Sequence, residues 1–254
     1  MSRWVQPNPW EQLRRHTAAR IALGRVGASL PTAEVLRFGL AHAQARDAVL
    51  TPMDTDHLCE TLENNGFPVL RVASRCEDRP TYLMRPDWGR QLNERGRHLL
   101  GDPAQSSPVA IVVGDGLSSV AVEHHALPLL LLLRQRLELD WARIPVILAR
   151  QARVALADEI GQLLGAEVAL MLIGERPGLS SPDSLGAYLT YRPKVGRNDG
   201  ERNCVSNIRP QGLSYPLAAQ KIAYLMEESL RRQLSGVGLK DDSMADVALL
   251  ADRR

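Results

Sequence analysis

The sequence predicts an α/β protein in which a mostly helical N-terminal region precedes a Rossmann-like unit with a mainly parallel sheet. Apolar residues recur at helical spacing through the first hundred residues, whereas short apolar runs alternate with helical segments from residue 109 onward. A polar, proline-flanked stretch over 102–108 separates the two patterns. We therefore expect a helical region over 1–101, an α/β unit over 102–236 and a frayed tail over 237–254.

Three helices are expected in the first part of the N-terminal region. The first begins at Asn8, a good N-cap followed by proline, and ends at Gly24. The second follows Pro31 and stops at Thr51, and the third runs from Asp54 to Asn65. Beyond them, β character is expected over 68–73 and 81–84, and a turn over 85–90 opens a helix that ends near Leu100.

The α/β unit is predicted from its apolar runs. The run over 109–113 is continuous, which is typical of a strand buried on both faces. The other expected strands cover 144–149, 168–173 and 185–191, and the expected helices cover 118–139, 155–164 and 216–234.

Composition excludes several classes of protein. The chain has 254 residues, is 44% hydrophobic and carries a formal charge of +2, so nucleic-acid binding through charge is not the default. Its three cysteines lie far apart and outside any zinc spacing, as expected for reduced thiols. No apolar leader opens the sequence, and the longest apolar run, 126–133, is too short to span a bilayer. We expect a cytoplasmic protein without membrane or nucleic-acid partners.

Four polar segments are candidates for a binding site. Ligands of open α/β sheets lie outside the carboxyl ends of the strands. Three segments leave such ends, at 114–119, 150–154 and 174–178, and a fourth, 202–207, lies between the last expected strand and the last helix.

Each candidate also has a structural interpretation. The 114–119 segment is half of a dinucleotide-binding pattern, but Ser119 replaces the third glycine and Ser118 suits a helix cap. Glu175 can form a surface ion pair with its neighbour, Cys204 can be a buried inert thiol, and Val154 can be an ordinary apolar residue at a helix start.

The sequence contains no recognisable catalytic motif. It lacks a His-x-x-x-His pair, a Gly-x-Ser-x-Gly elbow and a P-loop lysine. His124 and His125 are adjacent, so on a helix they point in different directions. We therefore predict neither a catalytic residue nor a metal ligand in this chain.

Five blocks in order give the chain a close resemblance to the small (light) subunit of ethanolamine ammonia-lyase. The resemblance extends from about Pro9 to Gly236. The blocks are Ala19–Arg25, Tyr82–Arg90, Gly114–Ser118, Gly174–Leu179 and Arg202–Ile208.

The resemblance implies an adenosylcobalamin enzyme that converts ethanolamine to acetaldehyde and ammonia by radical chemistry. A large subunit with a TIM-type barrel would hold the substrate and supply the catalytic residues. The small subunit would close over the cobalamin at the interface, as part of a hetero-oligomer. The motif with which some cobalamin proteins replace the lower base by histidine is missing here, so that base is expected to stay on cobalt.

The family's cobalamin contacts match three positions of this sequence: Val154, Glu175 and Cys204. Chemistry agrees with the resemblance, because a carboxylate accepts hydrogen bonds from the amides on the cobalamin rim. Valine offers an apolar edge, and cysteine is small with a weak donor.

The sequence also allows two other functions. An independent nucleotide-binding α/β oxidoreductase is the alternative that the 114–119 segment suggests, and a scaffold that touches no cofactor is another. Some members of the family that the chain resembles carry a long N-terminal extension associated with bacterial microcompartments, whereas about eight residues precede the first helix expected here. A free cytoplasmic enzyme is thus expected at least as much as an encapsulated one.

Overall fold

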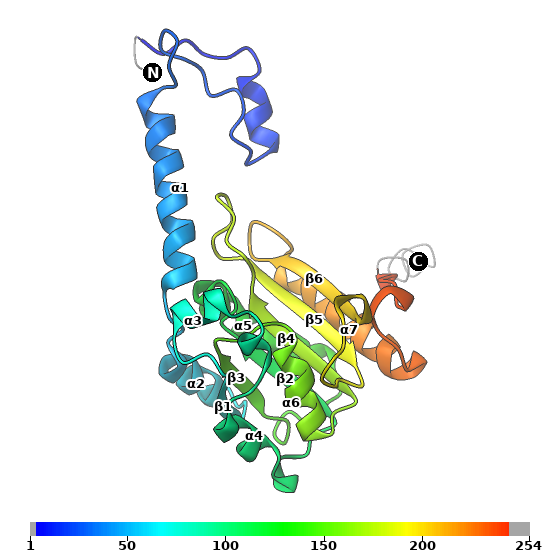
Figure 1. Cartoon of the computed structure of the whole chain (residues 1–254). Coiled ribbons are helices and arrows are strands. Elements are labelled where there is room, and N and C mark those ends of the chain that lie inside the picture. Colours follow the sequence, from blue (N-terminus) through cyan, green and yellow to red (C-terminus); the bar gives the residue numbers. More distant parts are fainter. Residues whose placement is uncertain (1–3, 244–254) are drawn as a thin grey trace, which may run out of the picture.

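A six-stranded, mainly parallel sheet organises the computed structural model, which describes residues 4–243 (Figure 1). The strand order is β1-β3-β2-β4-β5-β6. The strands are β1 (Val69–Ala73), β2 (Val109–Gly114), β3 (Val146–Arg150), β4 (Val168–Gly174), β5 (Leu185–Tyr191) and β6 (Arg202–Ile208). The first four are mutually parallel, and β5 and β6 are antiparallel to their neighbours. The expected mixed α/β class and mainly parallel sheet are confirmed.

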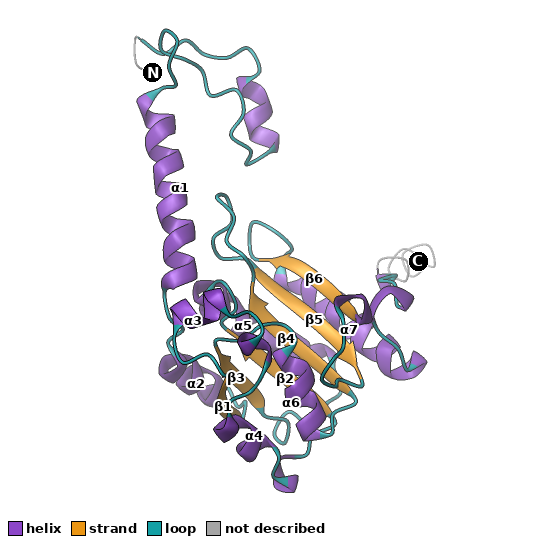
Figure 2. Ribbon diagram, in the orientation of Figure 1, coloured by secondary structure: helices purple, strands orange, loops and turns teal. Residues whose placement is uncertain are grey.

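Helices cover both faces of the sheet (Figure 2). Strand β2 shows why: Ile111 and Val113 pack in the cluster beneath α5 and α7, whereas Ala110 and Val112 pack beneath α4 and α6. Every residue of β2 and β4 is buried, as the continuous apolar runs predict. The helices are α1 (Thr32–Leu50), α2 (Thr55–Asn64), α3 (Arg79–Met84), α4 (Glu94–Leu100), α5 (Ser119–Arg136), α6 (Leu156–Leu164) and α7 (Tyr215–Arg232).

Strand β1 lies in the same sheet as the later strands, although it comes from the first hundred residues. Val69 is paired with Val146 of β3, and the parallel register continues to Ala73 and Arg150. The sheet therefore combines a strand that precedes the polar stretch at 102–108 with five strands that follow it.

Two expected elements are wrong. The 81–84 segment belongs to helix α3, because Asp78 accepts a hydrogen bond from the backbone N–H of Thr81 and Pro80 suits the first turn. The 202–207 segment, expected to lie outside the strands, belongs to strand β6 at the edge of the sheet, where Cys204, Ser206 and Asn207 are exposed.

The first expected helix shrinks to one short 3-10 helix, Glu11–His16. It buries none of its residues, so it lacks the apolar packing from which most helical stability in proteins comes. Residues 4–50, which we call the N-terminal arm, comprise this segment and α1, and they extend away from the sheet (Figure 1). The expected tail over 237–254 falls partly outside the described residues; within them, Gly236–Gly238 forms a 3-10 turn.

None of the helices found between residues 4 and 243 combines the length and the apolar character needed to cross a bilayer.

Candidate functional site

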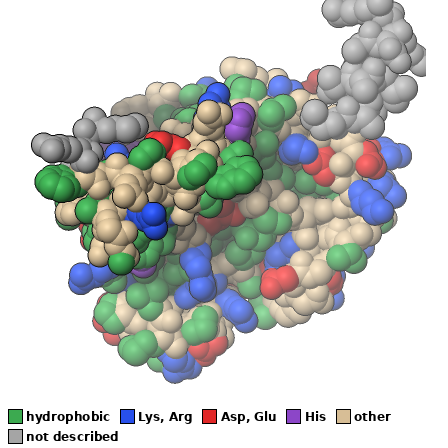
Figure 3. All heavy atoms as spheres, turned by 90° about the horizontal axis from the view of Figure 1, so that it is seen from above, with side chains coloured by type: hydrophobic (Ala, Val, Ile, Leu, Met, Phe, Trp, Pro, Cys, Tyr) green, Lys and Arg blue, Asp and Glu red, His purple; other side chains and the backbone are tan. Residues whose placement is uncertain are grey.

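A pocket lies at the carboxyl ends of the neighbouring parallel strands β2, β3 and β4. The chain leaves β2 towards β3 on one side and arrives in β4 on the other, which creates the switch point at which open α/β sheets bind ligands. The cavity volume is about 420 Å³. Its lining comprises Tyr82, Gly116, Leu117, Arg153, Val154, Ile173, Gly174, Glu175, Arg176 and Tyr188. Seen from above, this end of the molecule has a hollow near the middle of its face (Figure 3).

Two glycines bring the loops after β2 and β4 into direct contact. Gly116 has φ +55°, and a Cβ atom there would lie 2.2 Å from the carbonyl oxygen of Gly174. That carbonyl accepts a 2.9 Å hydrogen bond from the backbone N–H of Leu117. The N–H of Ser118 is bonded to the carbonyl of Asp115. Two amide donors that a pyrophosphate would need are therefore already engaged, which disfavours a dinucleotide site at this loop.

Val154 lies in the loop between β3 and α6 and is half-buried in the pocket wall. Asp115 holds the start of this loop, because its carboxylate accepts 2.9 Å hydrogen bonds from the backbone N–H groups of Gln151 and Ala152. Gln151 has φ +55°, a conformation that these bonds help to maintain.

The Tyr82–Arg90 block clamps the same loop from outside the sheet. The Tyr82 hydroxyl donates to the carbonyl of Ala152 at 3.0 Å, and the backbone N–H of Arg153 donates to the carbonyl of Gly89 at 2.8 Å. The Arg153 guanidinium stacks 4.2 Å from the Tyr82 ring centre. Gly89 leaves room for this stack, since a Cβ atom there would lie 2.7 Å from Cγ of Arg153. Burial raises the pKa of Tyr82 well above its usual range, so its hydroxyl stays a donor.

Glu175 follows β4 directly, and its carboxylate is held by one oxygen. Oε2 accepts hydrogen bonds from the Ser184 hydroxyl and, at 3.1 Å, from the backbone N–H of Asn207. Among residues 4–243, no hydrogen bond is made to Oε1. The carboxylate is therefore oriented by Oε2 and keeps Oε1 as an acceptor for a ligand.

Cys204 lies on β6 next to this pocket and does not line it. Its register partner on β5 is Tyr188, which is part of the lining. Although Cys204 is exposed, desolvation by its neighbours raises the pKa of its thiol, and the nearby Glu175 carboxylate adds to this effect. The thiol is a neutral, weak donor at pH 7 and not an activated nucleophile.

The structure thus brings Val154 and Glu175 into one pocket. Cys204 lies outside the lining, on the strand next to Tyr188, which is part of the lining. Sequence reasoning gave Tyr82 and Arg153 no role of their own. The signal for Tyr82 is its place in the Tyr82–Arg90 block, and the signal for Arg153 is its place in the strand-end segment 150–154.

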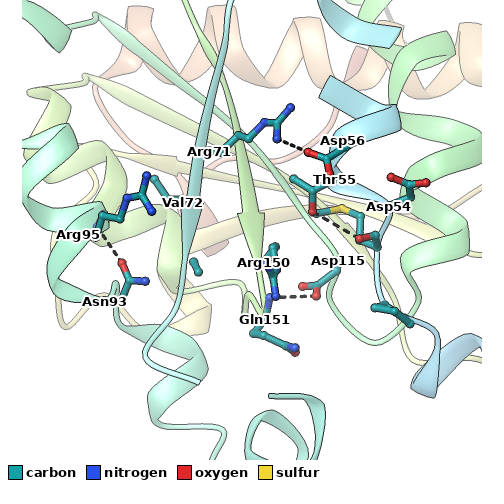
Figure 4. A pocket seen from close by; sticks show the side chains of 14 residues that line it. Asp54, Thr55, Asp56, Arg71, Val72, Asn93, Arg95, Asp115, Arg150 and Gln151 are labelled. Atoms are coloured by element: carbon teal, nitrogen blue, oxygen red, sulfur yellow. Dashed lines mark hydrogen bonds and ion pairs between the residues drawn. The ribbon is translucent and has the colours of Figure 1, made fainter. Parts of the chain in front are cut away.

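A larger cavity, about 660 Å³, lies at the carboxyl ends of β1 and β3 (Figure 4). Asp115 borders it, and the Asp115 carboxylate is the group that accepts the hydrogen bonds from Gln151 and Ala152 at the start of the β3 loop. Its charged lining is balanced: Arg71, Arg95, Arg150, Asp54, Asp56 and Asp115. Arg71 is paired with Asp56. None of the predicted site residues lies in this cavity.

Within residues 4–243, no group of three or more histidine, cysteine, aspartate or glutamate side chains is arranged to hold a metal ion. The rings of His124 and His125 contact each other edge to face, and Nδ1 of His125 forms a 2.8 Å hydrogen bond with the Tyr215 hydroxyl.

Residues 7–240 match the model of the family described as "Ethanolamine ammonia-lyase light chain (EutC)". The chain is 56% identical over 248 residues to the ethanolamine ammonia-lyase small subunit of Azotobacter vinelandii, covering 96% of this chain and 91% of that protein. It is also 56% identical over 241 residues to the protein of the same name from Pseudomonas putida, covering 93% and 89%.

Proposed function

The chain belongs to the ethanolamine ammonia-lyase light-chain family, that is, to the small subunits of a carbon–nitrogen lyase, and from this premise we propose that it forms one wall of an adenosylcobalamin site. The large subunit implied by a small subunit would supply the opposite wall, the substrate pocket and the catalytic residues. The reaction proposed is the conversion of ethanolamine to acetaldehyde and ammonia. The Rossmann-like description of the sheet is part of the proposal and is supported by the strand order β1-β3-β2-β4.

The residues of the pocket fit an edge of a cobalamin. Its volume of about 420 Å³ suits one rim of so large a group, as expected when a second chain completes the site. The free Oε1 of Glu175 is an acceptor for a rim amide, and Val154 with Leu117 supplies apolar contact. Cys204 adds a small neutral donor at the edge.

When bound, adenosylcobalamin supplies the radical chemistry. The residues of this chain bind one side of the cofactor and cover it. Glu175 accepts an amide N–H through Oε1 and is fixed by Ser184 and Asn207. The clamped loop presents Val154 with little freedom to move, so that little ordering is needed on binding. Together these groups shield the site from water.

The observation that carries the proposal is the half-satisfied carboxylate of Glu175 beside Val154. We expect Glu175→Ala to weaken cyanocobalamin binding by the assembled two-subunit enzyme about tenfold or more, as for loss of a charge-assisted hydrogen bond. Equilibrium dialysis followed by absorbance measures this. Glu167→Ala, at the exposed residue just before β4 and at the opposite end of that strand, is the matched control and should leave the affinity unchanged. Equal affinity in both variants rejects the proposed contact.

The independent oxidoreductase is disfavoured by the family and by the engaged amides of the 114–119 loop. We also propose a cytoplasmic location, free or inside a bacterial microcompartment. Fractionation of the source cells distinguishes the two.

A further inference from the structure

Helix α1 of the N-terminal arm leaves most of its surface without a partner in this chain. It has 19 residues, of which only Ala41 and Ala48 are buried. In Figure 1 it stands away from the sheet and carries the N-terminal segment at its far end. Such a helix would normally need a polar surface to remain in water.

The surface of α1 is instead apolar on more than one side. Leu36 and Leu40, four residues apart and so on one face, are 67% and 59% exposed. Val35 and Phe38, on another side of the helix, are 52% and 45% exposed. Leu30 precedes the helix and is 55% exposed. Exposed apolar side chains gathered on one helix in this way are typical of an element that is covered in a larger assembly.

This surface is connected to the rim of the proposed cofactor site. The Arg20 side chain donates from Nη2 to the carbonyl oxygen of Leu179 at 2.9 Å. Leu179 lies in the loop that follows Glu175, which lines the pocket. A partner that closes the pocket from above would therefore meet the N-terminal arm as well.

Charge argues against a second copy of this chain as the occupant. The arm contains six arginines but only three acidic residues. Four of the six arginines precede α1, and a symmetric dimer that pairs the whole arm with itself would bring two copies of this excess positive charge together, which is unfavourable. The surface fits a partner with an apolar groove and acidic side chains around it.

We propose that α1 of the N-terminal arm docks into an apolar, acid-rimmed groove of the large subunit and that this contact continues the wall of the cofactor site. The inference rests on the proposed function, because that function supplies the partner.

The test is a binding titration between this chain and its separately purified large subunit. The variant carries Leu36→Asp and Leu40→Asp. Its unfolding temperature should match that of the wild type, because both leucines are exposed. We expect binding on the order of 100-fold weaker, from the loss of apolar burial and the desolvation of two carboxylates.

Val195→Asp is the matched control. Val195 is 64% exposed and follows β5, whose last residue, Tyr191, pairs with the first residue of β4 at the other end of the sheet. This variant should bind like the wild type. If the double variant binds within about threefold of the wild type, the proposal is overturned.

Two further measurements separate the remaining outcomes. Amide hydrogen exchange across 32–50 of the wild type should slow when the large subunit is added, and unchanged exchange overturns the proposal even if the variant does not fold. Sedimentation of the lone chain should show no dimer that depends on Leu36 and Leu40; such a dimer also overturns it. A wild-type chain that does not bind the large subunit at all rejects the proposed function together with the docking surface.

Discussion

Tyr82→Phe tests whether the Tyr82–Arg90 block positions the loop that carries Val154. The substitution removes only the hydroxyl, whose 3.0 Å hydrogen bond to the carbonyl of Ala152 is fully buried. Stacking with Arg153 remains possible, because Phe keeps the ring.

The magnitude follows from what is left unpaired. Ala152 is buried, so losing the hydroxyl leaves its carbonyl without this donor and destabilises the fold by about 1–2 kcal/mol. The loop keeps two other anchors, namely the bond between Arg153 and Gly89 and the carboxylate of Asp115. Loss of about 1 kcal/mol of loop order corresponds to roughly fivefold weaker cofactor binding.

Urea unfolding of the lone chain measures the stability, and cyanocobalamin dialysis of the two-subunit enzyme measures the affinity. The matched control is Tyr215→Phe, which also loses one hydroxyl bond, to His125 at 2.8 Å, but lies outside the pocket lining. Both variants should lose stability, and only Tyr82→Phe should lose cofactor affinity. Equal affinities in the two variants would refute the positioning role of Tyr82.

Three further predictions concern a loop glycine, a buried ion pair and the thiol of the edge strand. Gly116→Ala should destabilise the fold by about 2–4 kcal/mol, because a Cβ atom there meets the Gly174 carbonyl at positive φ; a thermal melt equal to the wild type would contradict this. Asp158→Ala should destabilise by about 3 kcal/mol, since its partner Arg202 is 2% exposed and would keep only the exposed Asp199 as an ion-pair partner; a loss below 1 kcal/mol in urea, about the worth of an exposed pair, would show that this pair is not effectively buried. Cys204 should react with iodoacetamide more slowly than free cysteine at pH 8, and its rate should rise with pH towards a midpoint above that of free cysteine, because its raised pKa means that less thiolate is present at a given pH; a faster rate than free cysteine would contradict the shift.

The parallel core of the fold could be predicted because its strands are continuous apolar runs. The 109–113 and 168–173 runs become β2 and β4 within one residue, and 185–191 matches β5. Strand β6 could not be recognised in the same way, because it is an edge strand with exposed Cys204 and Ser206 and so lacks an apolar run.

Capping chemistry and tertiary packing explain the other differences. Apolar residues at 81–84 suggested a strand, but the helix start at Asp78 and Pro80 prevails. The expected first helix has suitable spacing yet finds no surface in this chain against which to pack, and only Glu11–His16 is helical.

Strand ends and the family resemblance together were enough to predict where the candidate pocket lies and two of its lining residues. Val154 and Glu175 come together because parallel strands deliver their carboxyl ends to one edge. The contribution of Tyr82 was not predictable, since it acts across a separation of 70 residues on the carbonyl of Ala152. No local pattern encodes such a contact.

The dependence of cobalamin binding on this chain tests directly whether the chain forms one wall of the cofactor site. Cyanocobalamin is titrated into the large subunit alone, into this chain alone and into the mixture, and bound cobalamin is measured by absorbance after dialysis. We expect tight binding only in the mixture, because the pocket of this chain, about 420 Å³, forms only one wall of the proposed site. Equal binding by the large subunit with and without this chain would contradict it.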